Sequence, residues 1–147
     1  MPLALPALKQ GLERTFAEPA ATAPLCAQGW ADAVSVYAAK IVPPSTTVTT
    51  ATSALSNALG TAFQTLDAVP GMEAAFKTFG AAVGLGMAGF APVPPAGPVG
   101  FASLFSGAQP TTHAEAAARI GDAIHAWLTT GTSTLLTPPG SPPVMWS

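Results

Sequence analysis

The stretch PGMEAAFKTFGAAVGLGMAGF, residues 70–90, has the most regular apolar pattern of the chain and decides the expected fold class. Pro70 suits the first turn of a helix, and Glu73 and Lys77 lie one turn apart on its flank. The large apolar residues recur every three or four positions, the spacing of one helix face: Met72, Phe76, Phe79, Val83, Met87 and Phe90. We therefore expect a helix here that packs this face into a core.

Four glycines interrupt this stretch: Gly80, Gly84, Gly86 and Gly89. Each costs about 1 kcal/mol relative to alanine inside an exposed helix, so they indicate a close neighbour or a break near residues 84–86. Because Gly80 and Gly84 lie one turn apart, we expect a second helix to approach closely there.

Similar apolar spacing predicts helices over residues 5–16, 26–41, 48–66 and 116–128. Pro43 and Pro44 end the second of these, because proline lacks a backbone donor and cannot continue a helix. The last begins at Thr112-x-x-Glu115, the pattern of a capping box, and Gly131 can terminate it.

Hydroxyl groups precede the predicted helix at 48–66. Ser45, Thr46 and Thr47 offer N-cap oxygens for its first turn. Four threonines between positions 46 and 50 lower helix propensity, because a β-branched side chain has few allowed rotamers in a helix. A strand over residues 46–52 therefore remains an alternative.

Two segments lack helical spacing. Residues 91–111 form a Pro/Gly-rich loop whose apolar residues are too many for a free linker, so it should pack onto the body. Residues 132–147 resemble an extended Pro-rich C-terminal arm with Trp146 near its end. The expected fold is all-α: a compact bundle of four to five amphipathic helices spanning residues 1–131, with this loop and this arm.

Charge is scarce throughout the chain. Five Lys or Arg and seven Asp or Glu make up 8% of 147 residues, whereas soluble domains have about a quarter. Much of the surface should therefore lie against other protein subunits. A net charge of −2 leaves no basic stripe for phosphates, so we expect no nucleic-acid partner.

The uncharged stretch from Thr78 to Ala114 is long enough to span a bilayer, but five prolines break it. We therefore expect no membrane partner, although a membrane-active helical protein, such as a pore or lysis factor, remains an alternative. Lys9, Glu13 and Arg14 come before any long apolar run, so we expect no secretory signal and assembly in the cytoplasm.

Groups for catalysis do not converge in the sequence. Asp122 and His125, three residues apart on one helix, form at most a surface pair. His113 lies twelve residues from His125, and Cys26 is the single cysteine, so neither completes a metal site. The glycines at 84–89 follow no strand, unlike a dinucleotide loop. We expect no enzyme activity, metal or cofactor.

Aromatic residues leave a further alternative open. Trp30, Tyr37, Phe76 and Phe79 lie on apolar stripes and should belong to the core. They could instead line a pocket, which would make the protein a small-ligand-binding helical bundle.

Read whole, the chain resembles the small, Ala-rich virion proteins of tailed bacteriophages. The segments that carry the resemblance are 30–33, 42–48, 86–90, 93–95, 127–131 and 146–147. The resemblance implies a repeated building block of a particle, in its tail, neck or baseplate, and it transfers no catalytic residue.

These observations together predict a non-enzymatic structural subunit located in a virion. Its partners would be copies of itself and other virion structural proteins. The loop and the arm should make the contacts between subunits, and truncating the arm should leave the body folded. The interface candidates are Phe101, Leu104, Phe105, Val144, Met145 and Trp146.

Overall fold

The computed structural model describes residues 3–18 and 21–147, and this part of the chain forms six helices and three strands. In chain order they are α1 Leu5–Ala17, α2 Ala23–Ala38, α3 Val48–Ala62, α4 Val69–Leu85, β1 Phe90–Val93, α5 Phe101–Ser106, α6 His113–Leu128, β2 Thr132–Leu135 and β3 Pro143–Met145. The fold is mostly helical, as the sequence predicts. The antiparallel sheet shows that it is not purely all-α.

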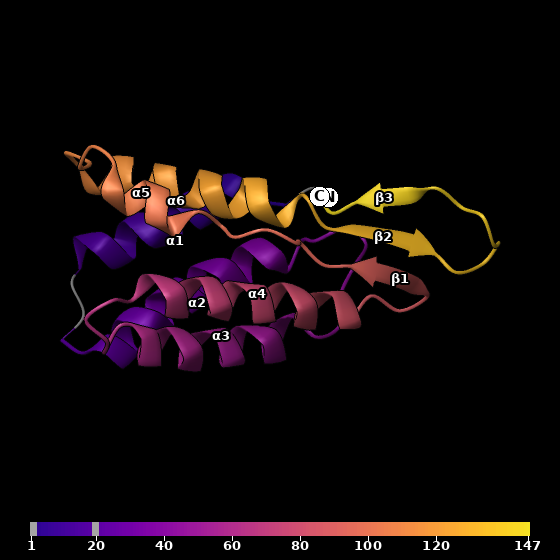
Figure 1. Cartoon of the computed structure of the whole chain (residues 1–147), viewed down its shortest axis with the longest axis horizontal. Helices are drawn as coiled ribbons and strands as arrows, with labels where there is room; N and C mark the ends of the chain where they lie inside the picture. Colours follow the sequence, from indigo (N-terminus) through magenta and orange to yellow (C-terminus); the bar gives the residue numbers. More distant parts are fainter. Residues whose placement is uncertain (1–2, 19–20) are drawn as a thin grey trace.

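The helices lie side by side along the long axis of the molecule, and the sheet projects from one end of them (Figure 1). α1 packs against α2 and α6, α2 packs against α3, and α3 packs against α4. Small residues allow these close contacts: a Cβ on Gly11 would lie 2.7 Å from the Cβ of Ala33, and one on Gly71 would lie 2.7 Å from that of Ala62. The alanine-rich composition therefore gives closely spaced helices.

The glycines of α4 do approach neighbours closely, but the neighbours are tryptophan rings. A Cβ on Gly80 would lie 2.9 Å from Cη2 of Trp127, and one on Gly84 would lie 3.3 Å from Cη2 of Trp146. The helix ends at Leu85, so the expected extension to residue 90 is wrong. The glycines thus make room for aromatic rings and end the helix within the same stretch.

Aromatic rings join the helices at the centre of the body. The ring of Trp30 meets those of Phe16 and Phe63 edge-on, with centroids 5.8 Å apart in both pairs. Phe101 continues the contact from Trp30 to Phe76, which also meets Trp127. Such pairs contribute about 0.5–1.5 kcal/mol beyond the apolar area that they bury.

The loop between β1 and α6 is packed onto the body, as predicted, although it contains the unpredicted helix α5. The Glu73 carboxylate accepts hydrogen bonds from the backbone N–H groups of Val99, Gly100 and Phe101 at 2.7, 2.9 and 2.8 Å. Indole Nε1 of Trp127 donates to the carbonyl of Gly97 at 2.8 Å. A carboxylate at the first turn of α5 satisfies N–H groups that have no partner within the helix.

Residues 132–147 do not form an extended arm. They fold back as β2 and β3, in the sheet order β1-β2-β3, and Trp146 is buried in the core of its own chain. The backbones of Val42 and Ser147 exchange two hydrogen bonds, at 2.8 and 3.1 Å. The segment therefore belongs to the packed body, and its truncation would remove part of the core.

The hydroxyls before α3 serve a different helix from the one expected. Ser45 Oγ donates to the carbonyl of Val83, and Thr47 Oγ1 donates to that of Ala82, each at 2.6 Å. These carbonyls lie in the last turn of α4, where the helix itself supplies no donors. α3 starts at Val48 without a side-chain cap, and the alternative strand over 46–52 is wrong.

Candidate functional site

Charged residues are distributed unevenly over the molecule. None lies in residues 78–114 or 123–147, which supply all three strands. We call these strands and the loop that joins β2 to β3 the sheet end. The backbone of Val42 pairs with Ser147, just after β3, and the charged residue nearest to Val42 in the sequence is Lys40. The sheet end is therefore an uncharged projection from a body that carries the charges.

One face of the sheet is uncharged, and its apolar side chains are open to solvent. The strand register places Val93, Thr132 and Met145 in one row and Ala91, Thr134 and Pro143 in another. Paired residues of antiparallel strands share a face, and alternate residues return to it, so these six residues form one surface. Val93 is 59% exposed and Met145 is 62% exposed. We call this surface the sheet face.

The opposite side of the sheet is directed at the body. Ser133 lies between Pro92 and Val144 in the register and is fully buried. Pro92 lies against α4, because a Cβ on Gly84 would come within 3.0 Å of the Cβ of Pro92. The body therefore fixes which side of the sheet meets solvent.

Trp146 occupies a fitted site next to this buried side. Its Nε1 donates to Ser133 Oγ at 2.8 Å, and Ser133 Oγ donates to the sulfur of Met87 at 3.1 Å. A Cβ on Gly131 would lie 2.5 Å from Cδ2 of the indole, so only glycine leaves room for the ring. We call Gly84, Met87, Gly131 and Ser133 the Trp146 socket.

The edges of the sheet are poorly suited to pairing with another strand. β1 contains Pro92, and β3 begins at Pro143. Proline has no N–H to donate, and natural sheets use it on edge strands to prevent further pairing. The sheet end therefore offers a face rather than an edge.

The structure separates the six interface candidates into two groups. Phe101 and Trp146 are buried in their own chain, so they are not accessible to a neighbour in this fold. Leu104 is partly buried, whereas Phe105 is 42% exposed and Val144 is 45% exposed. Met145 lies on the sheet face.

Six exposed large apolar residues in the described part of the chain are not among the interface candidates. Leu25, Val36 and Leu66 lie in or next to α2 and α3, and a second group consists of Leu85, Val93 and Leu136. All three of the second group lie in the uncharged runs, so the absence of charge was a signal for them. Their exposure could not be read from the sequence, because it depends on which strands pair.

An apolar pocket lies at the other end of the helices. It has a volume of about 530 Å³, and its lining includes Phe16, Cys26, Trp30, Phe63 and Phe105. Burial raises the pKa of the Cys26 thiol. The pocket differs from the one expected, because Phe76, Phe79 and Tyr37 are buried and Trp30 alone of that set lines it.

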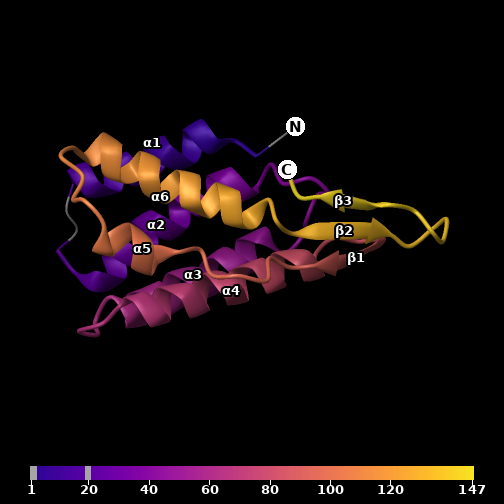
Figure 2. The same ribbon diagram turned by 45° about the horizontal axis from the view of Figure 1, so that its top comes forward.

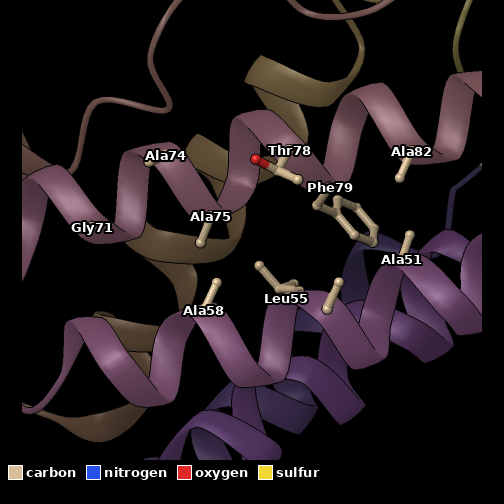
Figure 3. Close-up of a pocket in the computed structure, with 10 residues that line it drawn as sticks. Ala51, Leu55, Ala58, Gly71, Ala74, Ala75, Thr78, Phe79 and Ala82 are labelled. Carbon is tan, nitrogen blue, oxygen red and sulfur yellow. The ribbon is translucent and has the colours of Figure 1, made fainter.

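A second hollow follows the contact between α3 and α4 (Figure 3). Its volume is about 170 Å³, and small side chains such as Ala58 and Ala75 face each other across it. Leu55 and Phe79 line the hollow with larger apolar side chains, and Thr78 adds a hydroxyl group to the lining. This lining offers little chemistry for recognising a polar ligand.

Asp122 and His125 do not pair with each other. The Asp122 carboxylate binds Nζ of Lys9 at 2.7 Å, and Nδ1 of His125 meets the hydroxyl of Tyr37 at 2.8 Å. Burial raises the pKa of that Tyr37 hydroxyl. The two groups thus join α6 to α1 and to α2.

The capping box of α6 is present with one change. Thr112 Oγ1 accepts from the N–H of Glu115 at 3.0 Å, as predicted. The Glu115 carboxylate binds the N–H and hydroxyl of Thr111, one residue earlier than the pattern requires, and also binds Arg119. The bonds from Thr111, followed by the charge of Arg119, lower the pKa of Glu115.

Two searches of the described residues gave negative results. No helix within residues 3–18 and 21–147 has the length and apolar character needed to cross a membrane. In the same residues, no three His, Cys, Asp or Glu side chains are grouped so that they could hold a metal ion.

Comparison with protein-family models, with curated proteins and with solved structures finds no match for this chain. Its function therefore has to be argued from the geometry and from the resemblance described above.

Proposed function

We propose that this protein is a non-enzymatic structural subunit of a multi-subunit assembly and that it packs against other subunits through the sheet face. The observation that carries the proposal is the exposed row formed by Val93, Thr132 and Met145 on an uncharged surface. Exposed apolar surface of this kind typically marks protein contacts.

The energetics favour burial of this face. Complete burial of a fully exposed Val or Met side chain contributes about 1.5–3 kcal/mol, and the exposed parts of Val93 and Met145 would contribute a fraction of this. The sheet face has no charged group whose desolvation would oppose burial. Association also costs several kcal/mol in lost translational and rotational freedom, so burial of two side chains alone would not hold two subunits together. Leu136, which is also exposed and directly follows β2, adds to the apolar area.

We further propose that the assembly is a bacteriophage virion, with the subunit in its tail, neck or baseplate. The support for this assignment is the sequence resemblance together with the low charge. The partners would then be copies of this chain and other virion structural proteins, brought together in the host cytoplasm, and neither nucleic acid nor membrane would take part.

Light scattering on the purified chain, combined with single substitutions, tests the proposal. Val93→Lys places a charge on the sheet face and should shift an oligomer toward single chains. Leu66→Lys is the matched control, because Leu66 is also exposed but follows α3, away from the sheet. Equal masses for the two variants would place the interface elsewhere.

The pocket beside Cys26 supports a second candidate function, the binding of a small apolar ligand. Its volume of about 530 Å³ is typical of ligand sites, and aromatic rings line it. A ligand panel can be screened by thermal shift, and any hit should slow alkylation of Cys26. A hit that leaves this rate unchanged would exclude binding at the pocket.

A further inference from the structure

Residues 143–147 contact the rest of the chain along their whole length. β3 pairs with β2 through three residue pairs, and Trp146 fills its socket. The N–H of Trp146 donates to the carbonyl of Gly131 at 2.9 Å, and Ser147 pairs with Val42. We call residues 143–147 the exchange segment.

The preceding residues, 137–142, contribute little to the body. Five of the six are exposed, and their side-chain hydrogen bond, from Ser141 Oγ to the carbonyl of Pro138, stays within the loop. Figures 1 and 2 both show this loop as the point of the molecule farthest from the helices. We call residues 137–142 the hinge loop.

The reversal of the hinge loop depends on one glycine. Gly140 has φ 86°, a left-handed conformation that side chains with a Cβ rarely adopt. A Cβ placed there would have no neighbour within 4 Å, so a substitution would change the turn and no packing contact. Pro138, Pro139 and Pro142 restrict the backbone in the other parts of the loop.

We propose that the exchange segment passes between copies of this chain: β3 and Trp146 of one copy occupy β2 and the Trp146 socket of a second copy. This proposal rests on the self-association proposed above and names the element exchanged. In the closed form the segment binds its own chain, and in the exchanged form it binds a second copy. Its contacts are the same in both forms, so the equilibrium between them depends on the hinge loop and on protein concentration.

The socket itself argues for a second copy as the partner. It requires an indole N–H placed opposite Ser133 Oγ, a flat ring over Gly131 and, directly after it, a backbone that pairs with Val42. Residues 143–147 meet all three requirements in order. A second copy therefore brings a complete occupant, with no new contact needed.

Substitution of the turn glycine tests the exchange. Gly140→Val should disfavour the closed turn and raise the average mass above that of the wild-type protein at the same concentration, measured by light scattering. Gly89→Val is the matched control, because Gly89 has φ 81° and equally open surroundings but lies in the turn between α4 and β1. The control should lose stability to a similar extent without this rise in mass. Equal masses for the two variants would contradict the proposal.

Capture of a peptide tests it with the unaltered protein. A labelled peptide of residues 136–147 should bind the full chain as the resident segment leaves the socket. A peptide with Trp146→Ala should bind about a hundredfold more weakly or worse, because it lacks the indole. No capture after prolonged incubation, or equal capture of both peptides, would overturn exchange.

The two proposals fail in different ways. If Val93→Lys dissociates an oligomer but no peptide is captured, the sheet face stands and exchange is wrong. If the peptide is captured while Val93→Lys changes nothing, exchange stands and the sheet face is wrong, because Val93 lies outside the exchange segment.

Discussion

The helical body and the sheet end differ in the origin of their order. In the body, apolar residues repeat at helical spacing, and charged groups on the outer faces keep those faces solvated. At the sheet end there is no charge, and order comes from contacts between distant segments, such as the pairing of Phe90 with Leu135. A region held by long-range contacts can therefore be ordered while apolar side chains such as Val93 and Met145 stay exposed.

The largest expected effect on stability follows from replacing Trp146. This substitution tests whether the sheet end shares the core of the body. Trp146→Ala empties the socket and leaves Ser133 without the indole donor, so it should lower the free energy of unfolding by about 3–5 kcal/mol. Denaturant unfolding measures it. Leu66→Ala, at an exposed site, should change it little. Similar values for both variants would mean that the sheet end is not part of the core.

A second prediction concerns the glycine under the same ring. Gly84→Leu forces a side chain against Pro92 and the indole, so overpacking should cost about 1–3 kcal/mol. Ser53→Leu on an exposed face of α3 is a suitable control. Thr52 would be a poor one, because it is buried and donates to the carbonyl of Val48 at 2.7 Å. Thermal unfolding of the two variants at equal concentration decides between a close contact and open space.

A third prediction tests how the body holds the loop that follows β1. Glu73→Gln removes the charge that three N–H groups of the α5 region share, and it should cost about 1–2 kcal/mol. Lys77→Gln, one turn away, should cost less. If both cost the same, the carboxylate is not what orders α5, and amide exchange at Val99 and Phe101 would remain slow in the Glu73 variant.

The smallest effect should follow pH. The folded-state pKa of Glu115 is lowered, so its stabilisation is present above the unfolded-state pKa and is lost as pH falls through the folded-state value. The melting temperatures of the wild type and of Glu115→Gln should therefore differ at neutral pH and converge in acid. If the difference in melting temperature stays constant with pH, the Glu115 side chain stabilises the fold through packing and not through its charge.

The helices could be predicted because their signals are local. The stripe from Met72 to Val83 and the cap at Thr112 both lie within a few residues of the element that they define. Besides the short helix α5, which the sequence does not predict, the misses are at helix ends: the helix expected over 48–66 stops at Ala62. There, the Thr65 hydroxyl lies within hydrogen-bond distance of the carbonyls of Ala62 and Asp67, so the chain turns just after the helix.

The sheet could not be predicted for the opposite reason. β1 has four residues, and its partner β2 lies about forty residues further along the chain, so neither strand has a period of its own to detect. Trp146 was assigned to an arm because its socket is assembled from Gly84, Gly131 and Ser133, which are distant in the sequence. The scarcity of charge predicts contact with other subunits, but it does not single out Val93.

Hydrogen exchange, measured by mass spectrometry at low and at high protein concentration, tests most directly the claim that the sheet face is the association surface. The account predicts that β1 and β3 become more protected as concentration rises, while α1 and α2 do not change. Added protection confined to the helices, for example along the α3–α4 groove, would contradict it.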